Sequence, residues 1–499
     1  MCGITTTINH PKEITESLLD RLEHRGKDNR GIYQNKNVIL GHNRLSINDL
    51  SESGNQPMFY KDLVLVVNGE IWNSPELREE YKNRGYTFQS NSDSEIILYL
   101  YEQGELSRLD GMFSFVIYDT KIDKLFVGRD WVGKIPLFIS ITDKIVISSE
   151  LESIKSVLPT VVPNFVPVNS LITIDINDLN IDVQEGFYFK FSDEWTEWES
   201  PEEINQFVHD TLTHAVEKRL ISDVPIATSL SGGIDSAVIT YILSKNIPNL
   251  KAYTIKFEED SEDLRTARLV AKHLGIELIE VEIPKDPQII KDRFKEVIKV
   301  VSFPTTVQTQ VGILQSFIAE QMAKDGIKVA FSGEGADESF GSYGKIRMFS
   351  KIDVNFMKYR KYLHGIQHTS NLLRGNNIFM KFGTIELRCP FYDTQFVDKI
   401  CNTTSDHLSS GGQWKLPLAE GFRGLLPDEI LDQDKRAFQK GTNFKQWIEP
   451  LLIQDKEINF NKRTRMIEIC KDWFEQTFNY KFSKLKDDIT KNTIYKWTL

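Results

Sequence analysis

Short apolar runs separated by turn residues dominate the chain up to about residue 190. Runs rich in Val, Ile, Phe and Leu that are bounded by Gly, Asn and Asp are typical of β-strands, and one such run begins directly after Cys2. Because most of these strands are joined by short turns, we predict an antiparallel α+β layer structure. The predicted strands are 38–40, 63–67, 113–118, 124–127, 144–148 and 171–174, and the predicted helices are 75–83 and 94–101.

The pattern changes beyond residue 201, where strands and helices alternate. The segment before it, 187–201, is aromatic and acidic without a clear period, which indicates a linker. Alternating strands and helices predict βαβ units and a parallel sheet, and beyond residue 345 the pattern is mainly helical. The predicted strands are 224–229, 251–257, 277–282 and 328–332, and the predicted helices are 201–219, 236–243, 262–274, 287–300 and 311–325.

Length, charge and cysteine content narrow the class of protein. A chain of 499 residues is long enough for two or three domains. The net charge of −11 argues against a general nucleic-acid binder, whose phosphate contacts need a basic surface. The apolar runs are strand-sized, well below the ~20 residues of a membrane span. Four cysteines without a CxxC pair argue against a disulfide framework or a thiolate zinc site. We therefore expect a cytoplasmic protein.

A glycine-rich turn lies between a predicted apolar strand and a predicted helix, at Ser231-Gly232-Gly233-Ile234-Asp235-Ser236. Glycines let the backbone approach a ligand closely, successive N–H groups form an anion nest, and the helix adds its positive dipole end. The GK[ST] ending of a Walker A loop is absent. Asp235 is placed either to hold Mg²⁺ on bound phosphates or to cap the helix. Its place after a parallel strand favours the ligand site.

A second turn of this kind follows the strand at 328–332 and reads Ser332-Gly333-Glu334-Gly335-Ala336-Asp337-Glu338. In a doubly wound sheet, the end of this strand can face the first turn across the switch point. Asp235 and Asp337 would then share a cation, with Glu334 beside it as a candidate base. A solvated acidic loop is the alternative, and the glycines and the preceding apolar strand argue against it.

Taken in order, these and further motifs resemble the glutamine-dependent asparagine synthetase family over nearly the whole chain. The first part is similar to a class II glutamine amidotransferase domain, and the second part to the ATP pyrophosphatase domain of the family. The matching stretches of the first part include Met1-Cys2-Gly3-Ile4, His24-Arg25-Gly26, residues 41–50, Asn68-Gly69-Glu70-Ile71 and Ser92-Asp93-Ser94-Glu95. Those of the second part are 230–236, 332–338, Glu386-x-Arg388-x-Pro390-Phe391-x-Asp393, Gly424-Leu425-Leu426-Pro427, and Lys435 with Phe438.

The resemblance implies a fold class and two domains. We expect residues 2–190 to form an α+β N-terminal nucleophile domain, with antiparallel sheets in an αββα sandwich, that acts as a class II glutaminase. We expect residues 205–499 to form an asparagine synthetase (ATP pyrophosphatase) domain, with an α/β parallel sheet and a helical C-terminal part. ATP would be a substrate of the second domain and Mg²⁺ its cofactor.

For the first domain, the resemblance implies that Cys2 is the nucleophile once Met1 has been removed. A free α-amine titrates close to neutrality, so the amine of Cys2 could activate its own thiol. The Asn68 side chain and the Gly69 N–H would stabilise the oxyanion. Arg44 would bind the glutamine carboxylate and Asp93, helped by Glu70, its ammonium group, with Leu45 and Ile47 completing the pocket. Taken alone, Cys2 reads as a buried thiol, and Arg44 and Asp93 as members of surface ion pairs.

For the second domain, the resemblance implies a nucleotide site, a cation site and two catalytic side chains. Asp235 and Asp337 would bind Mg²⁺. Glu334 is similar to a residue needed to make or consume an acyl-adenylate, and Lys435 to a lysine that neutralises charge in the transition state, although a surface lysine is its plainer interpretation. The expected nucleotide-binding residues are Ser229, Leu230, Ser231, Gly232, Gly233, Asp235, Ser236, Ile255, Ser332 and Gly333.

Departures from the family pattern gather where the acceptor carboxylate should bind. Tyr392 stands where the family has leucine, the spacing at 383–386 is one residue longer than usual, and 303–306 matches only loosely. Glu386, Arg388 and Asp393 could recognise an acceptor, but for Glu386 and Arg388 we favour an internal ion pair that braces the fold.

The sequence therefore leaves three hypotheses. The first is an asparagine synthetase, which converts L-aspartate, L-glutamine, ATP and water into L-asparagine, L-glutamate, AMP and diphosphate through an acyl-adenylate. The second is the same chemistry on another carboxylate, on a sugar or a peptide. The third is a catalytically silent binding protein, which the intact Cys2, Asp235 and Asp337 argue against. The expected partners are glutamine, aspartate and ATP, without nucleic acid or membrane, and a homodimer is the assembly to test.

Overall fold

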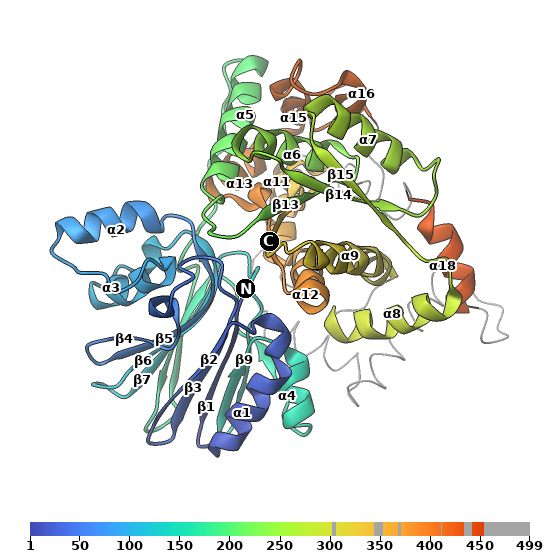
Figure 1. Cartoon of the computed structure of the whole chain (residues 1–499). Coiled ribbons are helices and arrows are strands. Elements are labelled where there is room, and N and C mark those ends of the chain that lie inside the picture. Colours follow the sequence, from blue (N-terminus) through green and yellow to red (C-terminus); the bar gives the residue numbers. More distant parts are fainter. Residues whose placement is uncertain (302–305, 344–352, 368–370, 411, 434–441, 454–499) are drawn as a thin grey trace. The chain divides into compact units, whose positions relative to one another are not determined.

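The structure is a computed structural model that describes residues 1–301, 306–343, 353–367, 371–410, 412–433 and 442–453 (Figure 1). By its internal contacts the chain divides into two compact units. The first unit is built mainly from Met1–Lys190, and the second unit from Phe191–Val297 and most of the later residues.

Two six-stranded antiparallel sheets form the first unit. Sheet A has the strand order β10 (Asn164–Phe165), β8 (Phe138–Ile141), β9 (Ile145–Ser148), β1 (Gly3–Ile8), β3 (Val38–Arg44) and β2 (Asn29–Asn35). Sheet B has the order β12 (Ile181–Glu185), β11 (Ser170–Asp175), β7 (Lys124–Arg129), β6 (Gly111–Asp119), β5 (Leu63–Ile71) and β4 (Met58–Tyr60).

The two sheets pack face to face and are covered by helices on both sides (Figure 1). Ile4 and Val38 of sheet A share a buried core with Val66 and Val127 of sheet B. The other face of sheet B packs on α2 (Ser74–Asn83) and α3 (Ile96–Glu102), and α1 (Lys12–Arg21) and α4 (Leu151–Val157) pack against β1, β3 and β9. This αββα sandwich confirms the predicted fold class.

Sequence reasoning found the long central strands of this unit and missed its smaller elements. It did not predict α1, α4, β2, β4, β8, β10 and β12. The residues that α1 buries are Thr15, Leu18 and Leu19, which is too few for a clear helical period. Every residue of β2 is partly or fully exposed, so this strand lacks the apolar run on which strand prediction relies.

A parallel sheet of five strands forms the centre of the second unit, which confirms the α/β prediction. Its order is β15 (Glu277–Glu282), β14 (Lys251–Lys256), β13 (Ile226–Ser229), β16 (Val329–Phe331) and β17 (Glu386–Arg388). The chain starts at β13, moves outward to β15 and returns to the other side of β13. The direction of winding therefore reverses between β13 and β16, where open α/β sheets bind their ligands.

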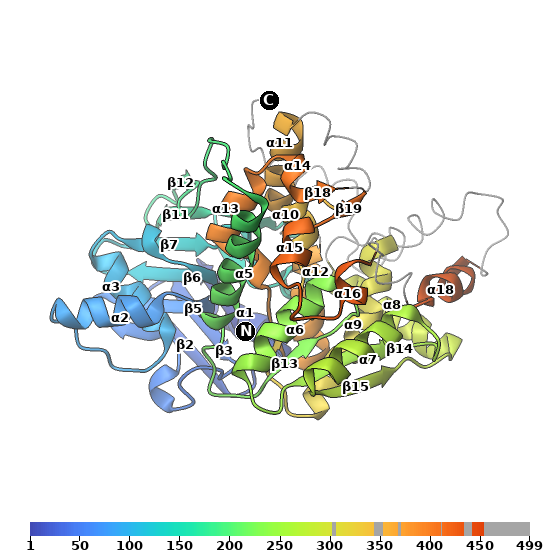
Figure 2. The same cartoon turned by 90° about the horizontal axis from the view of Figure 1, so that it is seen from above.

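Helices cover both faces of this sheet. α6 (Ile234–Asn246) and α7 (Glu262–Leu274) pack against β13, β14 and β15, and α9 (Thr306–Lys324) and α12 (Asn371–Gly383) against β14, β15 and β17 (Figure 1). α5 (Pro201–Glu217) packs on α6 and on α15 (Leu416–Gly421) (Figure 2). The remaining elements are α8 (Pro287–Val300), α10 (Ala336–Phe340), α11 (Asp353–Gly365), α13 (Thr394–Cys401), α14 (Ser405–Leu408), β18 (Ser409–Ser410), β19 (Gln413–Trp414), α16 (Asp428–Leu431) and α18 (Phe444–Ile453).

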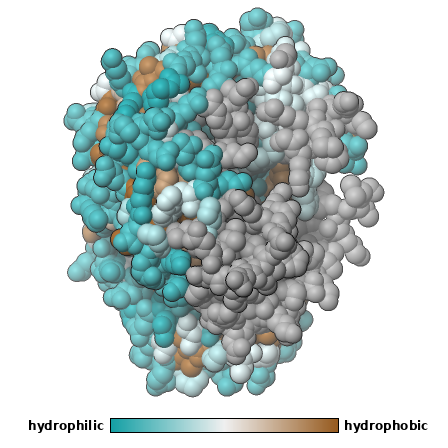
Figure 3. Space-filling view, turned by 90° about the vertical axis from the view of Figure 1, so that its right-hand side faces the viewer, coloured by the Kyte–Doolittle hydropathy of each residue, from teal (hydrophilic) through white to brown (hydrophobic). Residues whose placement is uncertain are grey.

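The described surface is mainly hydrophilic on the face shown in Figure 3, where hydrophobic residues form small separate groups. None of the described helices is both long enough and apolar enough to span a membrane.

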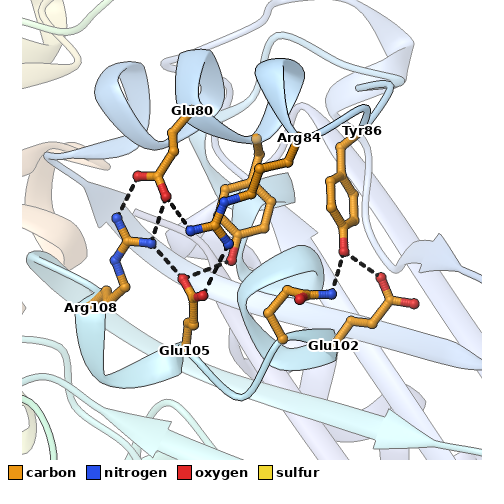
Figure 4. Close-up of polar contacts among 8 residues, drawn as sticks. Glu80, Arg84, Tyr86, Glu102, Glu105 and Arg108 are labelled. Atoms are coloured by element: carbon orange, nitrogen blue, oxygen red, sulfur yellow. Dashed lines mark hydrogen bonds and ion pairs between the residues drawn. The ribbon is translucent and has the colours of Figure 1, made fainter.

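Charged side chains stabilise the first unit both in its interior and at its surface. The Arg129 guanidinium is fully buried and donates to the carbonyl oxygens of Ile135 (2.9 Å), Val166 (2.7 Å) and Gly133 (3.0 Å). At the surface beside α2, Arg108 and Arg84 bridge Glu80 and Glu105 (Figure 4). The hydrogen bonds from Arg108 and Arg84 lower the pKa of Glu105 to about 2.

We predict that Arg129→Met destabilises the first unit by about 3 kcal/mol or more, because buried carbonyl groups that lose their donor cost about 1–3 kcal/mol each. Glu105→Gln is the control and should cost less than about 1 kcal/mol, because exposed ion pairs contribute little. That small contribution is present above the unfolded pKa of a glutamate and is lost as the pH falls toward 2. Amide hydrogen exchange of β6 and β7 measures both effects, and equal losses would contradict the argument.

Candidate active site

Cys2 lies directly before β1, at the end of sheet A where β3 finishes. The antiparallel register pairs Gly3 with Asn43, which brings Cys2 beside Arg44 and the loop after it. Cys2 is partly buried, and its Sγ lies 3.8 Å from the carbonyl oxygen of Leu45. The same loop reaches the end of β5, since the Asn48 side-chain amide donates to Glu70 Oε2 (2.8 Å). The loop after β3 therefore contacts both the Cys2 thiol and the end of β5.

Asn68 on β5 carries a side-chain amide that makes no hydrogen bond within the part of the chain that the structure describes. Asn68 is fully buried, and neither its Oδ1 nor its Nδ2 has a hydrogen-bond partner among the described residues. Leaving such a group unsatisfied costs about 1–3 kcal/mol, so a bound ligand or water would stabilise it. The next residue, Gly69, has a φ of 143°, and a Cβ there would lie 2.0 Å from the Met112 carbonyl oxygen. Only glycine fits this position beside Asn68.

Arg44 braces the loop between β3 and β4. Its guanidinium is buried and donates to the carbonyl oxygens of Ser51 (2.7 Å) and Asp49, and to Asn55 Oδ1 (2.8 Å). These bonds all start from the two terminal nitrogens of the guanidinium group. Binding of glutamine by Arg44 stays a prediction.

The carboxylates of Glu70 and Asp93 both lie at the end of β5. Asp93 Oδ2 accepts a hydrogen bond from the Ile71 N–H (2.7 Å), and Glu70 accepts one from Asn48. Both residues are buried, as are Leu45 and Ile47. Binding of the glutamine ammonium group by Asp93 and Glu70 stays a prediction.

In the second unit, the first glycine-rich turn connects β13 to α6. The Leu230 N–H donates to the Tyr253 carbonyl oxygen (2.9 Å), which continues the sheet beyond Ser229, and Ile255 is buried on the neighbouring β14. The turn is closed by Ser236 Oγ, which accepts from the Ser231 N–H (3.1 Å) and donates to the Gly233 carbonyl oxygen (3.0 Å).

The second glycine-rich turn packs directly against the first. It follows β16, and the Ser332 N–H donates to the Arg388 carbonyl oxygen (3.0 Å). A Cβ on Gly333 would lie 2.7 Å from both Asp235 C and Ser236 N. The close approach of the two turns at the switch point therefore depends on glycine at position 333.

Asp235 and Asp337 converge on the same point, as the sequence predicts, and the cation found there is the side chain of Lys415. Lys415 Nζ lies 2.6 Å from Asp235 Oδ1, 2.7 Å from Asp235 Oδ2 and 2.7 Å from Asp337 Oδ1. Burial disfavours the charged form of Lys415, but the two carboxylates outweigh it and raise the pKa of the lysine above its usual range. Sequence reasoning missed Lys415, which no motif links to residues so far away along the chain.

This donor set fits a hard divalent cation. Two carboxylates that share one cation position are the protein ligands that Mg²⁺ commonly uses, with phosphate oxygens and water completing the shell. Over the described stretches of the chain, no group of three or more His, Cys, Asp or Glu side chains could hold a metal by itself. A cation at Asp235 and Asp337 would therefore depend on the ligands that a nucleotide supplies.

Glu334 faces a buried polar network that sequence reasoning also missed. Arg374 on α12 donates to Glu334 Oε1 (2.9 Å), to Gln308 Oε1 (2.6 Å) and to Gln315 Oε1 (3.0 Å). Glu334 Oε2 is buried and has no hydrogen-bond partner in the described parts of the chain. Arg374 and Gln315 therefore both donate to Oε1, and Oε2 is left without a partner among the described residues.

The neighbouring Glu338 and Tyr392 are buried beside this turn. Burial, followed by the charge of Asp337, raises the pKa of Glu338, which accepts a hydrogen bond from Tyr343 OH (2.8 Å). Burial also raises the pKa of Tyr392, whose hydroxyl has no partner within the described residues. The ring of Tyr392 packs on Gly335, where a Cβ would lie 2.8 Å from its Cε2.

The other charged candidates for the acceptor site form internal ion pairs that stabilise the fold. Arg388 Nε binds Glu386 Oε1 (2.8 Å) with both residues buried, which confirms the internal ion pair. Asp393 binds Lys218 (2.5 Å) and Arg219 (3.2 Å) and caps α13. Lys435 lies outside the described residues, so its role stays a prediction.

Comparison with known proteins gives matches over both units. Residues 1–178 match the model of a glutamine amidotransferase domain, and residues 208–360 and 353–481 match that of asparagine synthase. The chain is 30% identical to a probable glutamine-hydrolysing asparagine synthetase of Dictyostelium discoideum, over 90% of this chain and 86% of that protein. It is 31% identical to asparagine synthetase B of Escherichia coli strain K12, over 86% and 79% of the two chains. It is 30% identical to asparagine synthetase 1 of Arabidopsis thaliana, over 90% and 80%.

We predict that Gly333→Ala destabilises the nucleotide-free second unit by about 1–3 kcal/mol, because the added methyl group overpacks the contact between the two turns. Gly233→Ala is the matched control in the first turn. Its Cβ would meet Ser231 Oγ at an ordinary 3.8 Å, so its stability should be close to that of the unchanged protein. Denaturant unfolding measures both variants, and equal effects would show that the contact does not hold the turns together.

Proposed function

Because the chain belongs to the asparagine synthase family, we propose that it is a glutamine-dependent asparagine synthetase. It would convert L-aspartate, L-glutamine, ATP and water into L-asparagine, L-glutamate, AMP and diphosphate. The observation that carries the proposal is that one chain matches both a glutamine amidotransferase model and an asparagine synthase model. A relative named asparagine synthetase also matches most of the chain. Residues 2–190 would be the glutaminase domain and residues 205–499 the synthetase domain.

In the glutaminase half-reaction, Cys2 Sγ attacks the side-chain carbonyl carbon of glutamine and its proton passes to the Cys2 α-amine. This step needs the removal of Met1, because the amine is otherwise part of a peptide bond. Asn68 Nδ2 and the Gly69 N–H would donate to the oxyanion, and the unsatisfied amide of Asn68 supports this role. The tetrahedral intermediate expels ammonia, and water then hydrolyses the thioester to glutamate.

In the synthetase half-reaction, an aspartate side-chain oxygen attacks the α-phosphorus of ATP and diphosphate leaves. The turns of residues 231–236 and 332–338 would cradle the nucleotide, and Asp235 and Asp337 would hold Mg²⁺, which supplies charge neutralisation on the phosphates. Ammonia then attacks the acyl carbon, AMP leaves, and one ammonia proton must be removed. The free oxygen of Glu334 is the group we assign to that proton, with Lys435 neutralising charge on the phosphate.

One observation favours the second candidate function, in which a different carboxylate is the acceptor. Tyr392 places a buried hydroxyl without an internal partner beside the turn that carries Glu334. Glu386, Arg388 and Asp393 are occupied by structural ion pairs, so the charged group next to Glu334 that could orient an acceptor is Arg374. An acceptor with a hydrogen-bonding group for Tyr392, on a sugar or a peptide, would use that hydroxyl.

A cytoplasmic location stays a prediction, which the low cysteine content of the chain supports. A homodimer stays a prediction.

We predict that the purified protein forms asparagine from aspartate, ATP, Mg²⁺ and glutamine, with aspartate-stimulated release of diphosphate. Mass spectrometry of the products and a diphosphate assay over a panel of carboxylates test this. If the protein hydrolyses glutamine but forms no asparagine and releases no diphosphate in response to aspartate, the second candidate function would replace the first.

We further predict that Cys2→Ala abolishes glutamine-dependent synthesis and leaves synthesis from ammonium salts intact, because the nucleophile and the nucleotide site belong to different units. Asp235→Asn is the reciprocal variant, and it should stop diphosphate release while glutamine hydrolysis continues at least in part. Loss of ammonia-dependent synthesis in a folded Cys2→Ala variant would contradict this division of labour.

A further inference from the structure

We infer that the ammonium group of Lys415 holds the place of the divalent cation in the nucleotide-free protein, and leaves it when the nucleotide and the cation bind together. The inference rests on the proposed nucleotide site at Asp235 and Asp337. It assigns to Lys415 a positioning role, in which the lysine keeps the two carboxylates together and couples cation binding to nucleotide binding.

The geometry at this point is that of a shared cation. A single Nζ lies within 2.7 Å of Asp235 Oδ1, Asp235 Oδ2 and Asp337 Oδ1. The lysine side chain is 6% exposed, and the carboxylates are 25% and 24% exposed. Two carboxylates this close repel each other unless a positive charge lies between them. The ammonium therefore offsets this repulsion and holds both aspartates in position.

The backbone of Lys415 is fixed, while its side chain can move. Lys415 precedes α15 with a φ of 63°, and its carbonyl oxygen accepts hydrogen bonds from the N–H groups of Leu418 (3.0 Å) and Ala419 (3.0 Å). The side chain reaches the aspartates through four flexible methylene groups. Rotation about these bonds can carry the ammonium away without any change in α15.

The ammonium and a divalent cation cannot occupy this position together. Mg²⁺ would need the same carboxylate oxygens at ~2.1 Å, and its charge would repel the neighbouring ammonium. Without nucleotide, the cation would have to displace Lys415 and leave its charge buried without a partner, which is unfavourable. Nucleotide phosphates remove this obstacle, because they accept the ammonium and add oxygen ligands for the cation. Cation and nucleotide should therefore bind with strong positive coupling.

A purely structural salt bridge is the competing explanation. In that case, Lys415 would stay between the aspartates when the nucleotide binds, and its removal would cost stability without opening a cation site. The two explanations differ in one measurable quantity, the affinity of the nucleotide-free protein for a divalent cation.

The test measures Mn²⁺ binding to the full chain by electron paramagnetic resonance, with and without a non-hydrolysable ATP analogue. The unchanged protein should bind Mn²⁺ weakly alone and tightly with the analogue. Lys415→Met should tighten nucleotide-free binding by about tenfold or more, because a nearby like charge is removed. The coupling between Mn²⁺ and the analogue should shrink accordingly.

Two further variants keep the test decisive. Lys218→Met removes one of the two basic partners of Asp393, in a salt bridge outside the turns, and should leave Mn²⁺ binding unchanged. Lys415→Arg keeps the positive charge between the aspartates, so we expect this variant to fold. Its binding of Mn²⁺ without the analogue should stay weak. Equal Mn²⁺ affinity in Lys415→Met and the unchanged protein, or the same affinity with and without the analogue, would overturn the inference. Failure to form asparagine would reject the proposed function alone, because this readout needs no acceptor.

Discussion

The contact between two glycine-rich turns is the constraint on which the site in the second unit depends. Strands β13 and β16 are parallel neighbours at the switch point, so their carboxyl ends open at the same edge of the sheet. Gly333 lets the second turn approach Asp235 more closely than any side chain would allow. That approach places Asp235 and Asp337 around a single point, and two carboxylates so close require a positive charge. The ammonium group of Lys415 supplies this charge.

The first unit contains a different kind of constraint, a buried polar group left without a partner. Folded proteins satisfy nearly all such groups, and the exceptions are often functional. The Asn68 amide is held on β5 in the interior of the αββα sandwich, and Gly69 next to it adopts a backbone conformation that other residues avoid. An unsatisfied amide on a rigid strand is a feature that an oxyanion site needs, and it supports the role that we propose for Asn68 and Gly69.

Charged residues in the second unit have two different roles, because some stabilise the fold and others belong to the candidate site. Glu386, Arg388 and Asp393 are buried in ion pairs with each other or with Lys218 and Arg219, so they position β17 and α13. Glu334 differs, because Arg374 binds one of its oxygens and the other has no partner among the described residues. We therefore propose that Glu334, Arg374 and Tyr392 are the residues that select the acceptor.

The sequence by itself determined the two fold classes, the long strands, the glycine-rich turns and the family. These features are local, because strand periodicity and turn conformation depend on residues that are close together in the sequence. It also indicated that Asp235 and Asp337 meet, since the order of strands and helices implies a switch point.

Only the tertiary structure decided which side chains complete each site. Lys415 and Arg374 lie far from their partners along the chain and belong to no motif, so their roles follow from packing alone. The same holds for Arg44, which local sequence cannot distinguish from a free arginine until its loop folds around it. Small elements such as α1 and β2 also needed the folded sheets, because contacts with their neighbours stabilise them more than their own sequences do.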